Sequence, residues 1–173
     1  MNKALVVVDM QNDFITGALA NEEGQKIVPK IAEYIRNFDG KIYVTKDSHD
    51  EHYMDTMEGK KLPVPHCILG TEGHDIVAEI YAALKEEDNF KTIIKLTFGS
   101  TDLAEELSTM EDIDEIILCG VCTDICVISN ALLIKAFCPN TKITVLKDLC
   151  AGVTPESHET ALKAMAACHI DIE

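Results

Sequence analysis

Apolar runs and helical repeats alternate along this chain. Short runs rich in β-branched residues predict strands that are buried on both faces, and each run ends at a polar residue or a turn. Between the runs, apolar residues recur at helical spacing, as Ile27, Ile31 and Ile35 do. We expect strands at 4–8, 42–45, 92–96, 116–119 and 142–146, a short edge strand at 170–172, and helices at 25–38, 75–85, 100–110, 123–137 and 155–168. This alternation predicts an α/β fold, with a parallel sheet covered by helices on both faces.

The stretch from Ser48 to Gly73 follows neither period. Loops of this length in compact domains are usually functional or disordered, and Pro63 and Pro65 favour an ordered loop here. Four of the six histidines lie in this stretch or directly beside it, at positions 49, 52, 66 and 74. We therefore expect the loop to carry part of a functional site.

Length and charge narrow the class of protein. A chain of 173 residues has room for one domain with a substantial core, and we expect residues 1–173 to form a single domain. The formal net charge of −15 argues against a nucleic-acid partner, since phosphate binding needs a basic surface, but it permits a small neutral substrate. No apolar run approaches the roughly 20 residues of a membrane span, and the first residues turn acidic too early for a signal peptide. We expect a cytoplasmic protein that does not bind membranes and keeps its cysteines reduced.

Chemically reactive side chains follow four of the predicted strands. Asp9, Asp47 and Lys95 mark the ends of the first three strands, and Cys122 and Cys126 follow the fourth. Because ligands of such sheets bind beyond the carboxyl ends of the strands, these residues should share one crevice. Each one taken alone could be a solvated strand exit or a small packed hydrophobe; their coincidence favours a functional site.

A carboxylate, a lysine and a thiol in one crevice can perform nucleophilic catalysis. Asp9 can accept the thiol proton, and Lys95 can lower the pKa of both neighbours. A thiol near a helix N-terminus also faces free backbone N–H groups that favour the thiolate and stabilise an oxyanion. The pattern leaves open whether Cys122 or Cys126 is the nucleophile.

The loop offers a second set of ligating side chains. Asp47 and His49 are two residues apart, so both can point the same way from an extended strand end. His66 or His52 could complete a site with three ligands and open positions. The alternative is a group of exposed loop histidines.

Several segments, taken in order, resemble a known family. VVVDMQNDFITGAL, TKDSH, PHCILGTEG, IIKLTFGSTDL and GVCTDICV together resemble the isochorismatase-like cysteine hydrolases, and most closely their nicotinamidase branch. The resemblance covers nearly the whole chain. It implies a three-layer α/β/α fold with a mainly parallel, six-stranded sheet.

The resemblance also implies catalytic roles. The triad would be Asp9, Lys95 and Cys126, so that Cys126 rather than Cys122 is the nucleophile. The Val121–Cys122 peptide bond would be cis, and the N–H groups of Cys122 and Cys126 would form the oxyanion hole. Phe14 and Val121 would contact the substrate.

A metal site is implied in the same way. Asp47, His49 and His66 match the metal ligands of nicotinamidases, and His52 matches an additional histidine that some members use. The ion would be divalent, with zinc expected first and manganese or iron as alternatives, and it would orient the substrate ring. Relatives are commonly homodimers or homotetramers, which implies an oligomer here.

The expected activity is hydrolysis of a small carboxamide through a thioester, with nicotinamide yielding nicotinate and ammonia. Another small amide or a ureido compound is the alternative substrate, and vinyl-ether hydrolysis of isochorismate or a non-catalytic binding role are more distant ones. One departure concerns the substrate. Nicotinamidases often carry a tryptophan shortly before the Pro-His-Cys segment, whereas this chain has no tryptophan and reads KLPVP at 61–65.

Overall fold

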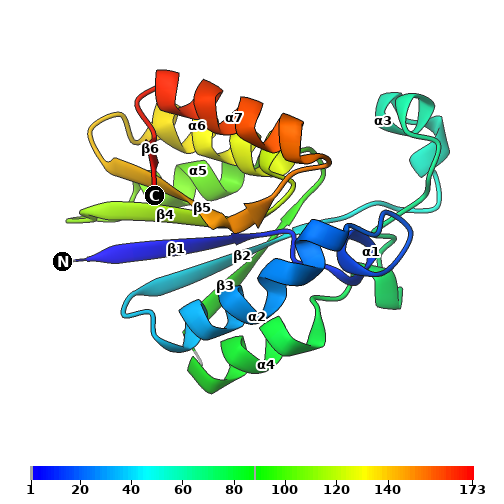
Figure 1. Ribbon diagram of the computed structural model, residues 1–173, viewed down its shortest axis with the longest axis horizontal. Helices are drawn as coiled ribbons and strands as arrows, with labels where there is room; N and C mark the ends of the chain where they lie inside the picture. Colours follow the sequence, from blue (N-terminus) through cyan, green and yellow to red (C-terminus); the bar gives the residue numbers. More distant parts are fainter. Residues whose placement is uncertain (1, 88) are drawn as a thin grey trace.

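The computed structural model describes residues 2–87 and 89–173. It contains one parallel sheet of six strands in the order β3-β2-β1-β4-β5-β6, shown in Figure 1. The strands are β1 (Lys3–Val8), β2 (Lys41–Asp47), β3 (Phe90–Lys95), β4 (Glu115–Val121), β5 (Lys142–Ala151) and β6 (Asp171–Ile172). The predicted α/β fold with a parallel sheet is therefore confirmed.

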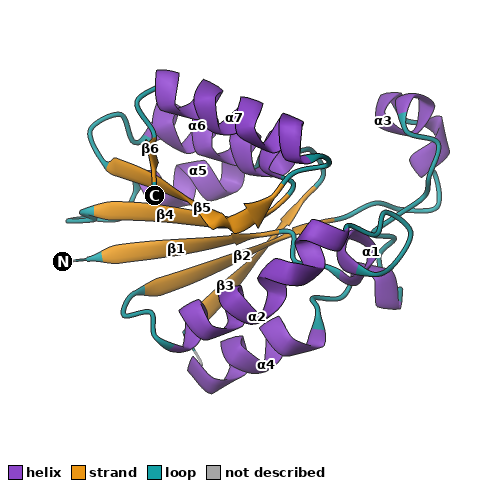
Figure 2. Ribbon diagram, viewed as in Figure 1, coloured by secondary structure: helices purple, strands orange, loops and turns teal. Residues whose placement is uncertain are grey.

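Helices cover both faces of the sheet and give the three layers seen in Figure 2. α2 and α4 lie on one face, and α5, α6 and α7 lie on the other. The helices are α1 (Asn12–Ile15), α2 (Glu22–Arg36), α3 (Met57–Lys61), α4 (Ala78–Glu87), α5 (Thr101–Ser108), α6 (Ile128–Phe137) and α7 (Pro155–Ala167). Single turns occur at η1 (Tyr53–Asp55), η2 (Glu72–His74) and η3 (Thr123–Val127), and η3 is a π-helical turn. None of the helices in the described ranges is both long and apolar enough to cross a bilayer.

Most boundaries fall near the predicted ones, and the exceptions have local causes. α2 begins at Glu22 rather than at 25, because the Asn21 side chain caps it by accepting a hydrogen bond from the Gly24 N–H at 3.0 Å. β5 continues to Ala151 rather than ending at 146. A register shift in the β4–β5 ladder lets the strand resume pairing with β4 at Gly120 and Val121. Polar residues at 147 and 148 conceal this extension in the sequence.

The core lies between the central strands and the helices. Leu5 to Val8 of β1 are fully buried, and Ile31 and Ile35 of α2 are also fully buried. Each such aliphatic side chain stabilises the fold by roughly 1.5–3 kcal/mol through its removal from water. These contacts fix the central strands rigidly, and the strands in turn fix the residues that follow them.

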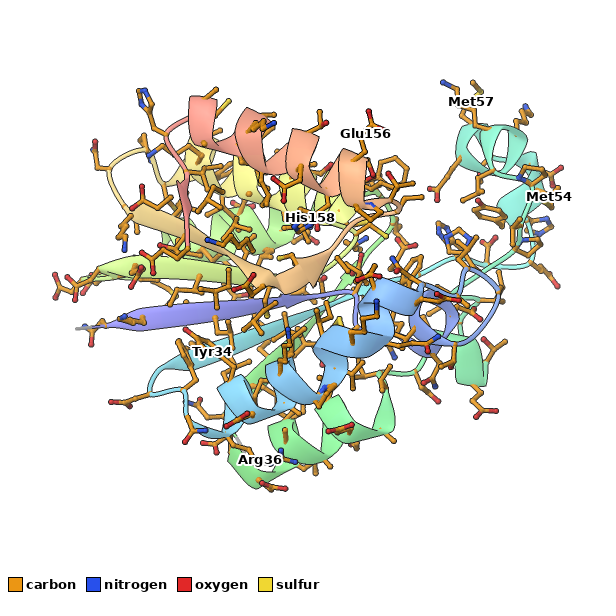
Figure 3. All side chains as sticks on the ribbon, viewed as in Figure 1. Tyr34, Arg36, Met54, Met57, Glu156 and His158 are labelled. Atoms are coloured by element: carbon orange, nitrogen blue, oxygen red, sulfur yellow. The ribbon has the colours of Figure 1, made fainter. Side chains whose placement is uncertain are left out.

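The long polar loop is ordered and forms a lobe that projects away from the layers around α3 (Figure 1). Inside the lobe, the Tyr53 hydroxyl donates a hydrogen bond to the Leu62 carbonyl at 2.8 Å. Met54 and Met57 point outward from it in Figure 3, and both are exposed. At the base of the lobe, the Cys67 N–H donates to an Asp13 carboxylate oxygen at 2.7 Å, which anchors the segment to the α1 region. The expectation of an ordered loop is thus confirmed.

Candidate active site

A buried lysine lies at the centre of the carboxyl edge of the sheet. Lys95, the last residue of β3, places its Nζ atom 2.7 Å from Asp9 Oδ2 and 3.1 Å from Asp47 Oδ1. The same Nζ atom lies 3.5 Å from Cys126 Sγ. Asp9 is fully buried, and the other three residues are at most 6% exposed. The structure therefore brings together the four predicted residues, which come from four separate segments.

Asp9 lies directly after β1, in the left-handed backbone region with φ of 49°. Its Oδ1 atom accepts a hydrogen bond from the Thr45 hydroxyl at 2.6 Å. Its Oδ2 atom has no hydrogen-bond donor with good geometry among the described residues, and its polar contact is the ion pair with Lys95. Burial raises the pKa of Asp9, the Lys95 charge lowers it, and the net pKa is above the ordinary value. This carboxylate is therefore a better proton acceptor than an exposed aspartate.

Lys95 remains the positive charge of the site. Burial lowers its pKa, but Asp9, Cys126 and Asp47 raise it, and the net pKa lies above the usual range. Lys95 also donates a hydrogen bond to the Thr97 carbonyl at 3.3 Å. The single charge of Lys95 is shared between the Asp9 and Asp47 carboxylates. Lys95 therefore connects the Cys126 thiol with the carboxylate that ends β2.

Cys126 and Cys122 differ in their surroundings, although both follow β4. Cys122 caps η3 after a cis Val121–Cys122 peptide bond, as the family resemblance implied. Cys126 is the fourth residue of η3 and is the one that contacts Lys95. Burial raises the pKa of Cys122 to about 12. Of the two cysteines, Cys126 is therefore the one placed against Lys95, and its role as nucleophile stays a prediction.

Burial of Cys126 acts against the thiolate that the helix start favours. It raises the pKa of the thiol well above the ordinary value, the negative charge of Asp9 adds to this, and Lys95 opposes it. The adjacent Asp9 carboxylate is placed to take the thiol proton during attack.

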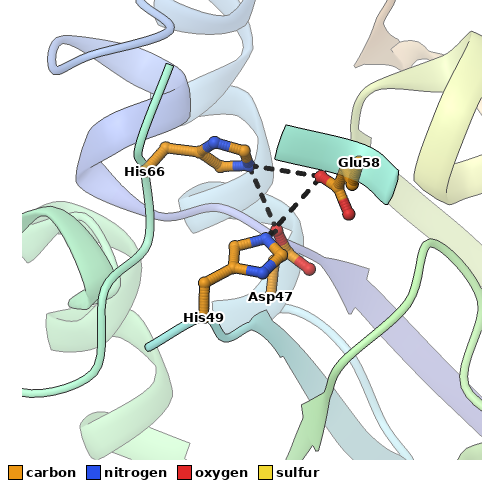
Figure 4. Close-up of side chains that lie close together, drawn as sticks. All are labelled: Asp47, His49, Glu58 and His66. Atoms are coloured by element: carbon orange, nitrogen blue, oxygen red, sulfur yellow. Dashed lines mark hydrogen bonds and ion pairs between the residues drawn. The ribbon is translucent and has the colours of Figure 1, made fainter. Parts of the chain in front are cut away.

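Four potential metal ligands cluster beside the triad, as Figure 4 shows. One ligand atom from each of Asp47, His49, Glu58 and His66 lies within 4.8 Å of the others. The Nε2 atom of His49 is 2.9 Å from Asp47 Oδ2, and that of His66 is 3.5 Å from the same oxygen. Both Nε2 atoms are 3.7 Å from Glu58 Oε1. Two imidazoles and two carboxylates form a donor set that suits a divalent ion such as zinc, manganese or iron.

Glu58 takes part in this cluster, and His52 does not. The His52 side chain is 71% exposed and lies near Glu51 and Asp55, away from the ligand atoms. Glu58 is carried by α3, whose start is capped by Thr56. Glu58 lies among several acidic residues of the loop, and no spacing in the sequence distinguishes it. The sequence therefore indicated a histidine where the fold supplies a carboxylate.

Neighbouring groups orient the two histidines. The His66 Nδ1 atom is 2.8 Å from the Val64 carbonyl, so Nδ1 carries the proton and Nε2 faces the cluster. The Tyr53 ring packs edge-on against His49 and His66, with centroid distances of 4.7 and 5.0 Å. Phe14 is half-buried, and its ring lies 5.4 Å from that of His66. The predicted substrate aromatic thus lies beside the predicted metal ligand.

Gln11 and Val121 complete the surroundings of the site. The fully buried Gln11 side chain accepts a hydrogen bond from the Asp47 N–H at 2.8 Å and donates to the Asp47 carbonyl at 2.9 Å. The sequence analysis missed this anchoring role, for which only the QND motif after β1 is a signal. Val121, predicted to contact substrate, is fully buried at the end of β4 and belongs to the hydrophobic core.

The electrostatics of the cluster match a cation. Burial alone raises the pKa of Asp47, but hydrogen bonds to His49 and His66 and the charge of Lys95 lower it below the ordinary range. Burial and the charge of Asp47 raise the pKa of Glu58. A divalent cation among these ligands would relieve the repulsion between the two carboxylates. The residues present therefore fit a metal ion on their own chemistry.

Comparisons with known proteins agree with this geometry. The family model described as the isochorismatase domain matches residues 3–172. A relative from Bacillus subtilis, named an uncharacterized isochorismatase family protein PncA, is 36% identical over 179 residues, covering 96% of this chain and 95% of the relative. The nicotinamidase/pyrazinamidase of Mycobacterium tuberculosis is 28% identical over 183 residues, covering 98% of this chain and 97% of the relative.

A solved structure gives the same result in three dimensions. The crystal structure of the pyrazinamidase of Pyrococcus horikoshii in complex with zinc matches with a TM-score of 0.82 at 32% identity, covering 100% of this chain and 99% of that chain. The family match, the fold and the arrangement of reactive groups agree with one another. The chain belongs to the isochorismatase-domain family, in its nicotinamidase-related branch, and is an amidohydrolase.

Proposed function

We propose that this chain hydrolyses nicotinamide to nicotinate and ammonia through a thioester on Cys126. The observation that carries the proposal is the position of Lys95 Nζ, 2.7 Å from Asp9 and 3.5 Å from Cys126. In this arrangement a thiol, a proton acceptor and a fixed positive charge meet at one buried point. The whole of residues 1–173 acts as a single catalytic domain.

Asp9 moves the proton in both halves of the reaction. As the Cys126 sulfur attacks the carboxamide carbon, its proton passes to Asp9, and the carbonyl electron pair moves onto oxygen. The tetrahedral intermediate collapses, the C–N bond breaks, and Asp9 returns the proton to the departing nitrogen to release ammonia. A water molecule then attacks the thioester and gives a proton to Asp9, which passes it to the leaving sulfur. Lys95 balances the charge of Asp9 throughout.

Backbone N–H groups supply the oxyanion stabilisation. Those of Cys122 and Cys126 belong to the start of η3, where the first N–H groups of a helix lack partners within it. Donors of this kind, aimed at the position of a developing oxyanion, contribute on the order of 3–4 kcal/mol each. The tight turn after β4 therefore positions the Cys126 sulfur and also provides the N–H groups that stabilise the oxyanion.

Asp47, His49, Glu58 and His66 would hold a divalent ion beside the triad. Such an ion, when bound, supplies a positive centre that orients the heterocyclic nitrogen of the substrate. Tyr53 keeps the two imidazoles in place, and Phe14 lines the same side as an apolar wall. The expected homodimer or homotetramer and the cytoplasmic location remain predictions.

Nicotinamide is the leading substrate because the relatives include a nicotinamidase/pyrazinamidase and a zinc-bound pyrazinamidase. A different small amide or a ureido compound is the second candidate. The observation in its favour is the absence of tryptophan from the whole chain, which removes the ring-stacking residue implied by the family resemblance. The two candidates share the reaction and differ only in what lies next to the carbonyl carbon.

The test measures ammonia release from nicotinamide by the purified protein supplied with zinc, manganese or iron. We expect turnover by the wild type and none by Cys126→Ala, with Cys122→Ala as the matched control that retains activity. Turnover of a ureido compound but not of nicotinamide would replace the substrate and keep the reaction. Activity retained in Cys126→Ala and lost in Cys122→Ala would overturn the mechanism.

A further inference from the structure

The site depends on a contact between two segments that are far apart in the sequence. Lys95 belongs to β3, next to the outer edge of the sheet, whereas Cys126 belongs to the turn between β4 and α6. The order β3-β2-β1-β4 places two strands between them. Sheet pairing alone therefore fixes their separation only indirectly. A more direct connection runs through a side chain that the mechanism does not use.

That side chain is Asn130, which lies in the first turn of α6 and is fully buried. Its Nδ2 atom donates a hydrogen bond to the Cys126 carbonyl at 2.8 Å and another to the Phe98 carbonyl at 3.2 Å. Its Oδ1 atom accepts one from the Ser100 N–H at 2.9 Å. Both donor hydrogens are used, and all three partners are backbone groups. One amide group thus joins the backbone of the nucleophile to the segment at 97–100 that follows Lys95.

A second observation supports close docking of that segment on α6. A Cβ atom built on Gly99 would lie 2.5 Å from Leu133 Cδ1 and 3.2 Å from the Ser129 carbonyl oxygen. Both neighbours belong to α6 and flank Asn130 along the helix. A side chain at position 99 would require Leu133 to move and the segment to shift by a few tenths of an ångström from the helix backbone. Glycine and asparagine together therefore hold the two pieces in direct contact.

We propose that Asn130 is a positioning residue that sets the separation between the Lys95 ammonium and the Cys126 sulfur. The proposal rests on the proposed role of Cys126 as nucleophile. Lys95 Nζ also donates to the Thr97 carbonyl, within the segment that Asn130 holds. Displacement of this segment therefore moves the ammonium as well as the loop backbone. The attraction between ammonium and thiolate falls with distance and with entry of water, so a looser contact makes the sulfur less nucleophilic.

The first test replaces Asn130 with leucine, which has a similar volume and no hydrogen-bonding groups. Iodoacetamide alkylation of Cys126 is followed against pH in the intact protein, and the modified residue is identified by peptide mapping. We expect the rate at neutral pH to fall about tenfold and the midpoint of the pH profile to move upward by about one unit. A role confined to fold stability would leave the profile of the folded variant unchanged.

Asn37→Leu is the matched control. Asn37 also donates from Nδ2 to the carbonyl four residues earlier, that of Glu33, but on the exposed end of α2. It should alkylate at the wild-type rate.

Gly99→Ala tests the same contact from the opposite side and keeps the proposal falsifiable if Asn130→Leu does not fold. Its methyl group should separate the loop from α6 and shift the Cys126 profile in the same direction. A wild-type profile in folded Asn130→Leu, or in Gly99→Ala when the leucine variant does not fold, overturns the proposal. Because alkylation requires no substrate, a shifted profile without nicotinamide turnover would sustain the positioning role and reject nicotinamide as the substrate.

Discussion

Two buried carboxylates that pair with lysines lie at opposite ends of the same sheet. At the amino end, Glu115 opens β4 and is 5% exposed. Its carboxylate lies 2.8 Å from both Lys3 Nζ and Lys142 Nζ and accepts a hydrogen bond from the Thr144 hydroxyl at 2.7 Å. At the carboxyl end, Asp9 has a single ammonium partner, Lys95. The first group has two cations for one carboxylate, whereas the second has one cation for several groups.

Opposite pKa directions result from this difference. Burial raises the pKa of Glu115, but the hydrogen bonds from Lys142, Lys3 and Thr144 outweigh it and bring the pKa to about 2. Burial of Asp9 is only partly offset, so its pKa is raised. A well-paired carboxylate is inert as a base near neutral pH, while an under-paired one can exchange a proton. The raised pKa of Asp9 therefore comes from burial that a single cation does not offset.

The two ends of the sheet should differ most in activity when one lysine is removed from each end. Lys95→Met should lower amide hydrolysis about 10³-fold, since the charge that balances Asp9 and the sulfur is lost. Lys142→Met, at the paired end, should change the rate by less than about twofold. Steady-state kinetics on both variants, with circular dichroism to verify folding, makes the measurement. Equal losses in the two variants would show that the rate follows general stability.

Metal affinity tests whether Glu58 or His52 is a metal ligand at the carboxyl end of the sheet. Glu58→Gln should weaken zinc binding by about 10–100-fold, because one of the two carboxylates of the cluster is neutralised. His52→Gln is the control on the same lobe and should bind zinc as the wild type does. Competition with a chromogenic chelator measures both affinities. A larger loss in His52→Gln than in Glu58→Gln would restore the histidine that the sequence suggested.

Stability should respond to the loss of a carboxylate charge more strongly at the amino end than at the carboxyl end. Glu115→Gln should lower the free energy of unfolding at pH 7 by about 1–3 kcal/mol, since it leaves buried donors poorly paired. Because the folded pKa of Glu115 is lowered, its contribution is complete above the unfolded value near 4.5 and is lost as the pH falls through about 2. Urea titrations at neutral and acidic pH should therefore show a difference from wild type that shrinks on acidification.

Asp9→Asn should have the smallest effect on stability. The raised pKa of Asp9 means that its charged form is unfavourable in the folded state, so its contribution to stability falls as the pH rises through the folded pKa. Removing the charge relieves this burial cost but leaves Lys95 without its nearest partner, so the free energy of unfolding at neutral pH should change by less than about 1 kcal/mol while hydrolysis is abolished. Destabilisation of Asp9→Asn to the same extent as Glu115→Gln would erase the proposed distinction between the two ends.

Sequence reasoning succeeded where local pattern and topology act together. Apolar runs ending at Asp9, Asp47 and Lys95 identified strands, and the rule that ligands lie at the carboxyl ends of parallel strands placed these residues in one crevice. The structure agrees with this placement, because the end of the sheet at which these residues lie depends only on strand direction. The resemblance to the family supplied the preference for Cys126 over Cys122, which periodicity alone did not.

The failures concern properties that depend on the full three-dimensional surroundings. Glu58 faces the cluster because of how the lobe folds back, which no spacing encodes. The burial that raises the pKa of Cys126 depends on residues far away in the sequence, so the sequence near Cys126 does not indicate it. Asn130 looked like an ordinary helix residue, since its partners at 98 and 100 lie about thirty residues away.

Strand order also has a consequence for the time course of synthesis. β1 pairs with β2 on one side and with β4 on the other, and the partner of Lys3 is Glu115. While the chain is being made, the apolar strand β1 therefore has one edge with unpaired backbone groups until most of the protein has emerged from the ribosome. A nascent chain stopped before β4 should be retained by chaperones or aggregate. A fragment that ends before β4 also lacks Cys126 and cannot hydrolyse an amide. Activity therefore becomes possible only after β4 is available to pair with the open edge of β1.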